Sequence, residues 1–202
     1  MTRGLKPLLL EVLFFCLISI AFQFDCPATM EKVEGAAEDS CYSLLDLGGM
    51  EYPMASLYCQ VSITTEVGAA QIVIPKNVGE LQALVKFVLS KGIPTAGQSG
   101  FWVNYRRDEP APLEDDGSLS ANNSMIRKDR SQFVDRIELK VMPDELWRAE
   151  SQPGDQTDDR DEQCVAQSYP GNPFHQGLDD FACSGYELHN ALCEVKLGPP
   201  PA

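Results

Sequence analysis

The stretch from Trp147 to Cys193 reads WRAESQPGDQTDDRDEQCVAQSYPGNPFHQGLDDFACSGYELHNALC. It alternates segments rich in carboxylate and amide side chains with cysteines at positions 164, 183 and 193. A hard cation such as Ca²⁺ takes about six to eight oxygen ligands, so two acidic loops anchored by cysteines suit it chemically. An acidic loop can equally be a solvated loop without a ligand. The cysteine framework of the whole chain decides between these two interpretations.

The first residues predict a secretory signal. Arg3 and Lys6 precede an almost wholly apolar segment from Pro7 to Ile20, and small residues follow near Ala21. An uncleaved membrane anchor is the alternative, but an apolar core of roughly 14 residues is shorter than the ~20 needed to cross a bilayer. We therefore expect residues 1–21 to be a signal peptide, the mature chain to be secreted and extracellular, and no later segment to span a membrane.

The charge of the chain narrows the classes of partner. Sixteen basic and 30 acidic side chains give a formal net charge of −14. Nucleic acids and anionic lipids bind through basic groups, so the sequence predicts neither as a partner. An acidic surface is compatible with binding cations.

The cysteine count indicates a disulfide framework. Seven cysteines are present, and Cys16 lies in the predicted signal. Six in a secreted chain imply three disulfides, with 15 pairings that spacing alone cannot distinguish. Zinc is a poor alternative, because no Cys-x₂-Cys pair exists and the only histidines are His175 and His189. Neither histidine lies in a nucleophile motif, so we expect no enzymatic activity.

Two helices are predicted. The first runs from Pro53 to Val61, with Cys59 on or beside its buried face and Pro53 at a position where a helix tolerates proline. Its apolar residues recur at i, i+3, i+4 and i+7: Met54, Leu57, Tyr58 and Val61. The second begins at Asn77 as N-cap, has Glu80 in the capping-box position and ends at Gly92. Its apolar face consists of Leu81, Leu84, Val85 and Val88.

Several segments read as strands or loops. Residues 69–74 are rich in β-branched side chains and predict a buried strand or an extended segment. Residues 101–105 have an alternating pattern rich in aromatic residues, which predicts a core strand, and residues 191–197 are predicted to form the closing strand. Residues 108–144 read as an irregular insertion, in which residues 133–142 could add a strand. Asn122 begins an N-glycosylation sequon, and residues 198–202 form a tail without a folding signal.

The order of these features resembles the C-type lectin-like domain, over about Cys26 to Lys196. The marks that carry the resemblance are Cys26-Pro27, Ser40-Cys41-Tyr42, Ala55 with Cys59, Phe101-Trp102-Val103, Asp116-Gly117-Ser118, Trp147 before Gln152-Pro153, Cys164-Val165, Asp180 three residues before Cys183, and Cys193-Glu194. The resemblance implies an α+β fold for residues 22–197, with two helices, two small antiparallel sheets and a long loop region. It also implies three disulfides: Cys26 to Cys41, Cys59 to Cys193, and Cys164 to Cys183.

The resemblance further implies a site. Sugar-binding members hold one Ca²⁺ through a Glu-Pro-Asn or Gln-Pro-Asp motif, a glutamate before a cysteine, and an Asn-Asp pair. The corresponding ligands here are Gln152, Asp155, Glu162, Asp179 and Asp180, of which Gln152, Glu162 and Asp179 would also bind carbohydrate. The Gln-Pro start resembles the galactose-type motif. We expect the two tryptophans, Trp102 and Trp147, to lie in the core rather than against a sugar.

Three positions depart from the family pattern. Gly154 offers no side-chain oxygen where the motif has Asn or Asp, and Asp155 is the nearest substitute. Leu178 replaces a tryptophan. Asp179 replaces an asparagine, and a carboxylate keeps the metal ligand but lacks the amide donor that a sugar hydroxyl accepts from.

Two functions are therefore expected from the sequence. The first is a secreted, calcium-dependent carbohydrate-binding protein that recognises surface glycans in innate defence, agglutinating them if it forms oligomers. The alternative is a lectin-like domain that binds a protein partner without calcium or sugar.

Overall fold

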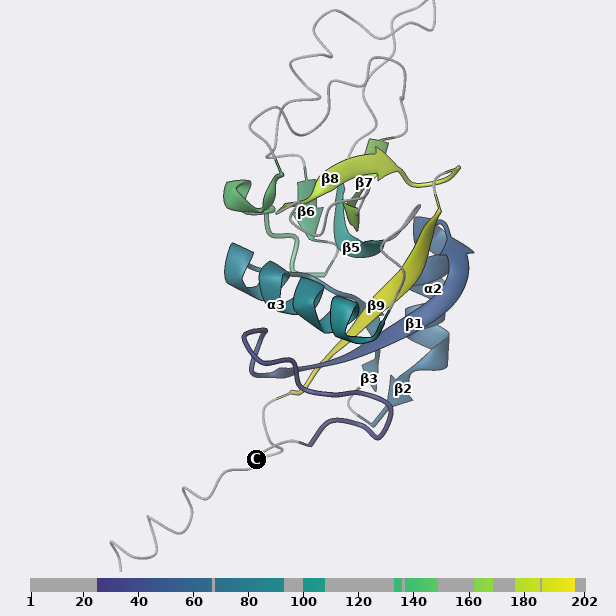
Figure 1. The fold of residues 1–202 in the computed structure, drawn as a ribbon, viewed down its shortest axis with the longest axis vertical. Helices are drawn as coiled ribbons and strands as arrows, with labels where there is room; N and C mark the ends of the chain where they lie inside the picture. The colour runs from purple at the N-terminus through teal and green to yellow at the C-terminus, as the bar shows by residue number, and fades with distance from the viewer. Residues whose placement is uncertain are drawn as a thin grey trace, which may run out of the picture. The chain divides into compact units, whose positions relative to one another are not determined.

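Most strands in the part of the chain that the structure describes join one sheet of seven strands, which Figure 1 shows in part. The computed structural model describes residues 25–66, 68–92, 100–107, 133–135, 137–148, 162–168, 177–185 and 187–198. Residues Cys26–Leu197 group into one unit. The predicted signal peptide, Asn122, His175 and residues 199–202 lie outside the described residues. No helix in the described ranges is long and apolar enough to cross a membrane.

The sheet is built around its last strand, β9. Its main path runs in the order β1-β9-β5-β7-β8, while β4 also pairs with β9 and β6 with β5. The strands are β1 (Ser40–Met50), β4 (Gln71–Ile72), β5 (Gly100–Arg107), β6 (Phe133–Asp135), β7 (Glu162–Ser168), β8 (Asp179–Ala182) and β9 (Leu188–Lys196). A separate hairpin pairs β2 (Thr64–Thr65) with β3 (Gly68–Ala69).

The α+β class predicted from the sequence is confirmed, with one difference in the sheets. Two small antiparallel sheets are predicted, whereas the structure joins both halves of the main sheet through a parallel contact of β5 with β9, at Phe101 and Asn190. The side chain of Asn190 reinforces this junction, because its Nδ2 donates to the Gly100 carbonyl oxygen at 3.2 Å.

Helix α3 (Val78–Ser90) forms as the sequence predicts. The Asn77 side chain accepts a hydrogen bond from the Glu80 backbone N–H at 2.9 Å, and the Glu80 carboxylate accepts one from the Lys76 N–H at 2.6 Å. These bonds satisfy amide groups that a helix start leaves without partners. The buried residues of α3 are Leu81, Ala83, Leu84, Phe87 and Val88. Gly92, just past the end, adopts φ +73° as a helix-ending residue does.

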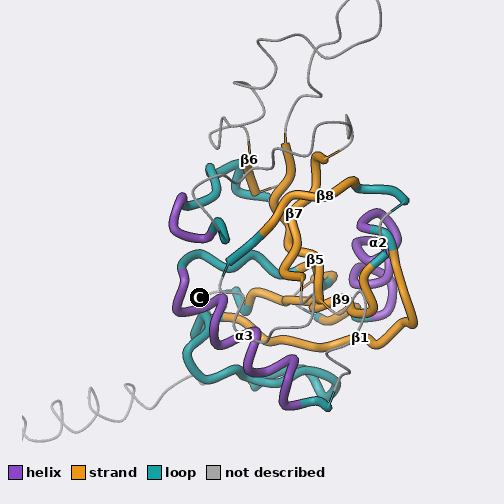
Figure 2. Tube along the Cα trace, turned by 45° about the horizontal axis from the view of Figure 1, so that its top comes forward, coloured by secondary structure: helices purple, strands orange, loops and turns teal. Residues whose placement is uncertain are grey.

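Helix α2 (Tyr52–Ser62) is also present, but the prediction of its buried face is wrong. The inward residues are Tyr52, Ala55 and Cys59. The four apolar residues predicted to face the core are exposed: Met54 44%, Leu57 49%, Tyr58 36% and Val61 63%. The helix packs against β9 and β4, and Figure 2 shows it at a different place on the sheet from α3.

Three disulfides cross-link residues Cys26–Leu197. They join Cys26 to Cys41, Cys59 to Cys193, and Cys164 to Cys183, the same pairs that the resemblance implies. Cys59–Cys193 ties α2 to the central strand β9 across 134 residues of chain. The other two close short loops of 15 and 19 residues. Of the three disulfides, Cys59–Cys193 therefore constrains the unfolded chain most.

The end of the predicted irregular insertion belongs to the fold. Phe133 and Met142 are buried, and residues 133–135 and 137–142 belong to a hairpin in which Val134 pairs with Val141. The Asp135 carboxylate shapes the turn by accepting hydrogen bonds from the backbone N–H groups of Ile137 and Glu138, at 2.8 and 2.6 Å. The short helix η2 (Asp144–Leu146) follows.

Both tryptophans lie in the core, as predicted. Trp102 is fully buried, and its Nε1–H donates to the Met50 carbonyl oxygen at 2.8 Å. Trp147 is 6% exposed and packs edge-on against Phe133, with ring centroids 5.0 Å apart.

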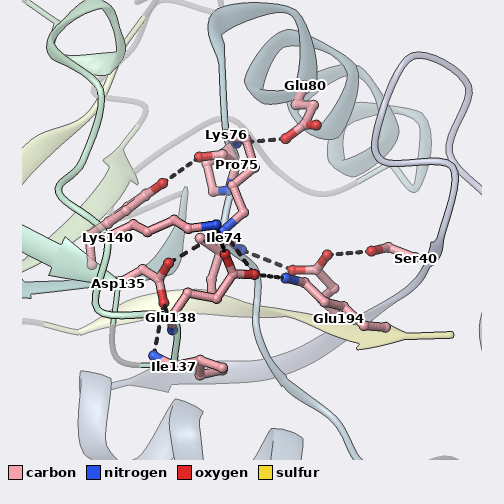
Figure 3. A network of polar contacts seen from close by, with 12 residues as sticks. Ser40, Ile74, Pro75, Lys76, Glu80, Asp135, Ile137, Glu138, Lys140 and Glu194 are labelled. Atoms are coloured by element: carbon pink, nitrogen blue, oxygen red, sulfur yellow. Dashed lines mark hydrogen bonds and ion pairs between the residues drawn. The ribbon is translucent and has the colours of Figure 1, made fainter. Parts of the chain in front are cut away.

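A network of polar contacts crosses the sheet beside the hairpin, as Figure 3 shows. The Glu138 carboxylate contacts Lys140, Lys196 and Lys76, and their hydrogen bonds and charges, led by Lys140, lower its pKa to about 2. Glu194 is instead buried, and its carboxylate accepts hydrogen bonds from the Ser40 hydroxyl at 2.6 Å and the Ile74 N–H at 3.1 Å. Burial raises the pKa of Glu194 above its ordinary value despite these bonds.

Removing the Cys59–Cys193 disulfide should lower the free energy of unfolding more than removing the Cys164–Cys183 disulfide. By the loop-entropy relation, Cys59→Ala with Cys193→Ala should lower the free energy of unfolding by about 5 kcal/mol, and Cys164→Ala with Cys183→Ala by about 3 kcal/mol. Urea unfolding under non-reducing conditions measures both. Equal losses in the two variants would contradict the ranking.

Glu194→Gln should raise stability at neutral pH and leave it unchanged in acid. In the wild type the folded state favours protonated Glu194, so stability falls as pH rises from 4.5, the carboxyl's ordinary pKa, through the raised folded pKa. Glutamine carries no charge to desolvate, and it can accept from Ile74 while donating to Ser40. Melting temperatures of the two proteins should coincide near pH 4 and diverge towards pH 7, with the variant higher. A variant that melts lower at pH 7 would refute this account of Glu194.

Candidate functional site

The candidate site lies where the chain enters β8. Leu178 is buried, its N–H donates to the Leu146 carbonyl oxygen at 2.7 Å, and its own carbonyl oxygen accepts from the Arg148 N–H at 3.0 Å. This contact is possible because the preceding residue is Gly177, at φ +132°. A Cβ at that position would lie 2.3 Å from the Arg148 Cα. The glycine therefore allows two segments distant in the sequence to pair directly.

The pairing brings Arg148 against Asp179, the first residue of β8. The Arg148 Nη1 lies 2.7 Å from the Asp179 Oδ2. The Asp179 side chain is 9% exposed and that of Arg148 is 31% exposed. A carboxylate buried to this extent requires a partner, and the guanidinium supplies both charge and hydrogen-bond donors.

Strand β7 brings a further candidate ligand beside β8. The antiparallel register pairs Glu162 with Ala182 and Val165 with Asp180. The ladder is irregular between Glu162 and Cys164, so Glu162 lies opposite the end of β8 while Asp179 and Asp180 lie at its start. The Cys164–Cys183 disulfide fixes this register. The paired strands β7 and β8 thus carry three of the predicted ligand residues, Glu162, Asp179 and Asp180.

Of the predicted ligands, Glu162 begins β7, and Asp179 and Asp180 begin the neighbouring strand β8. Gln152 and Asp155 lie outside the described residues. Within the ranges described, no group of three or more His, Cys, Asp or Glu side chains is arranged to hold a metal ion. The oxygen donors on β8 have the chemistry that Ca²⁺ prefers. One of them, Asp179, is already engaged by Arg148.

Sequence reasoning missed Arg148. A signal was present, because residues 141–195 contain only two basic residues other than histidine, Arg148 and Arg160, among many carboxylates. A lone cation directly before an acidic loop is placed to compensate a nearby carboxylate. Only the pairing of Leu178 with residues 146–148 identifies that carboxylate as Asp179.

No family model matches the sequence, and no sequence of a curated protein matches it either. Solved structures do match the fold. The C-type lectin CEL-I from Cucumaria echinata superposes with a TM-score of 0.53 at 14% identity, over 86% of this chain and 99% of that one. The carbohydrate-recognition domain of the mouse scavenger receptor C-type lectin gives 0.54 at 15% identity, over 86% and 100%.

A third matching structure is a complex with a glycan. The C-type lectin domain of murine dendritic cell inhibitory receptor 2, in complex with an N-glycan, gives a TM-score of 0.52 at 16% identity, over 85% of this chain and 99% of that one. At these identities the likeness shows the fold. The chain has the C-type lectin-like fold that the sequence resemblance implies.

The Arg148–Asp179 pair should contribute measurably to stability. Arg148→Met leaves a buried carboxylate without the guanidinium, so it should destabilise the domain more than the double variant with Asp179→Asn. We expect a coupling of about 1–2 kcal/mol, between the values typical of exposed and buried pairs. Urea unfolding of the single and double variants in EDTA gives this coupling.

The ion pair of Lys91 with Glu31 is the matched control, because its side chains are 37% and 54% exposed. Lys91→Met and Glu31→Gln should couple by less than about 1 kcal/mol. A coupling at Arg148–Asp179 no larger than this would show that the buried pair is not a structural link.

Proposed function

We propose that this protein binds carbohydrate, and that it does so with calcium at the edge of the sheet formed by β7 and β8. The observation that carries the proposal is the position of Asp179 and Asp180, which begin β8 directly beside β7. The fold is that of solved lectins, one of which is described in complex with an N-glycan.

The donor set fits a hard cation. Asp179, Asp180 and Glu162 offer carboxylate oxygens, and Gln152 and Asp155, four and seven residues after Arg148, would complete the ligands. Calcium bound there would coordinate sugar hydroxyls directly. Asp179 would serve as an acceptor only, so the donors to a sugar hydroxyl must come from elsewhere. The Arg148 guanidinium, 2.7 Å from Asp179, is a group that has them.

The wider setting follows from the sequence. We propose that residues 1–21 are removed as a signal peptide, that residues 22–197 form the lectin domain with residues 198–202 as a tail, and that the mature protein acts outside the cell. Asn122 would carry the glycan of a glycoprotein. Recognition of surface glycans in innate defence is the role such a secreted domain would serve.

A second function is favoured by one specific observation. The 2.7 Å contact of Arg148 with Asp179 places a cation of the protein's own beside a carboxylate that calcium would need. A site closed by this ion pair is stable without a metal ion. Such a domain would use the same edge to bind a protein partner, and chelators would not affect that binding.

Calcium should stabilise the protein if the first function holds. A ligand that binds only the folded state at 100 times its Kd adds about 2.7 kcal/mol, which calorimetry detects as a rise in Tm. Asp179→Ala with Asp180→Ala should abolish the rise, and Glu31→Gln, at an exposed carboxylate away from β8, should keep it.

Glycan-array binding with and without EDTA then separates the two functions. Calcium-dependent spots that disappear in the Asp179 and Asp180 double variant support the lectin. No calcium-induced rise in Tm, together with a partner retained from extracellular fluid in EDTA, would favour the protein-binding alternative instead.

A further inference from the structure

The large apolar side chains that are exposed in the described part of the chain fall into two groups. One group is Met54, Leu57, Tyr58 and Val61 on α2. The other is Ile137, Leu139 and Val141 on the hairpin after β6. The α2 group recurs at i, i+3, i+4 and i+7, so its members form a continuous stripe along one side of the helix.

The stripe lies on a helix without charge. None of the 11 residues of α2 is acidic or basic, in a chain whose formal net charge is −14. The residues of α2 that are exposed are Pro53, Met54, Leu57, Tyr58, Gln60, Val61 and Ser62. A helix that faced only water would normally carry charged side chains on its outer side.

The hairpin group is different in its surroundings. Glu138 and Lys140 alternate with its apolar residues, and Lys76 and Lys196 contact the same carboxylate. Charged groups that already pair with one another keep that surface hydrated. The α2 stripe is therefore the better candidate for a covered surface.

The fold prevents α2 from turning its stripe inward. Cys59 is bonded to Cys193 on β9, and Ala55 is fully buried against the sheet. The Tyr52 hydroxyl donates to the Asn104 Oδ1 at 2.7 Å. Rotation of the helix would break the bridge and expose these groups, so the stripe can be covered only from outside.

We propose that a second copy of this chain covers the stripe, with the two α2 helices packed against each other across a two-fold axis. Two chains of charge −14 repel each other, and an uncharged helix is a surface on which they can meet without placing like charges opposite one another. A partner recognised by charge would find no complementary group on this face. An anionic membrane would be repelled by the acidic protein.

The geometry of the stripe suits a symmetric helix pair. Met54 with Tyr58, and Leu57 with Val61, form two i, i+4 ridges with a groove between them, and identical ridges of a second helix can enter that groove. A helix of this length is only about 16 Å long, whereas stable interfaces bury about 800 Å² per partner. We therefore expect α2 to form the apolar centre of a dimer that dissociates reversibly in the micromolar range. The proposal does not depend on a glycan site.

Sedimentation velocity of the protein as a secreting host releases it, with its disulfides formed, tests the proposal over about 1–200 µM. We expect a monomer–dimer equilibrium that is the same in EDTA and in calcium and that strengthens as NaCl increases, because salt screens the repulsion between acidic chains. Leu57→Glu with Val61→Glu should weaken the dimer at least 100-fold. Both positions are exposed, so circular dichroism should remain that of the wild type, as should the Tm measured at a protein concentration where both are monomers.

Ile137→Glu with Leu139→Glu is the matched control, since it places two charges on the other exposed apolar group and should leave the dimer intact. In a second measurement, Leu57→Cys should form a disulfide-linked dimer and Ile137→Cys should not. A chain that stays monomeric throughout, or a dimer that survives Leu57→Glu with Val61→Glu, would overturn the proposal. A monomer that sediments with phosphatidylcholine vesicles would overturn it too and assign the stripe to a lipid surface.

Discussion

The disulfide between Cys59 and Cys193 fixes the position of α2 on the sheet, and much of the remaining structure depends on it. Cys193 lies in β9, the strand that pairs with β1, β4 and β5. Because the bridge turns Cys59 inward, Tyr52 and Ala55 follow it into the core. The apolar stripe of Met54, Leu57, Tyr58 and Val61 is consequently directed outward. One covalent constraint thus accounts for both the buried and the exposed face of α2.

This constraint also explains where the sequence was a sufficient guide and where it was not. Helix α3 has local signals that agree with its packing, since Asn77 and Glu80 cap its start and Leu81, Leu84 and Val88 of its predicted apolar stripe are buried. Helix α2 has an equally regular apolar stripe, yet a distant cysteine decides which side faces the sheet. Periodicity predicts that a helix is amphipathic, but it does not distinguish a core from a surface that another molecule covers.

In the candidate site, too, some residues could be named from the sequence and one could not. Asp179 and Asp180 could be named as candidates from the family resemblance, and the Cys164–Cys183 disulfide that it also implies anchors the strand that carries them. Arg148 could not be named as their neighbour, since it meets Asp179 only through the pairing of residues 146–148 with Leu178. That contact also depends on Gly177, where any side chain would collide with Arg148. An ion pair at the entrance to β8 is therefore a property of the fold rather than of a motif.

The central claim is that ligands are recognised at the edge formed by β7 and β8. Backbone amide chemical shifts of the isotope-labelled protein, followed during titration with Ca²⁺ and then with a galactose-terminated glycan, test this claim residue by residue. The account predicts that the largest shifts map to Arg148, residues 162–168 and residues 177–182, while α2 and α3 are unchanged. Shifts concentrated on either helix, with β7 and β8 unchanged by both ligands, would contradict it.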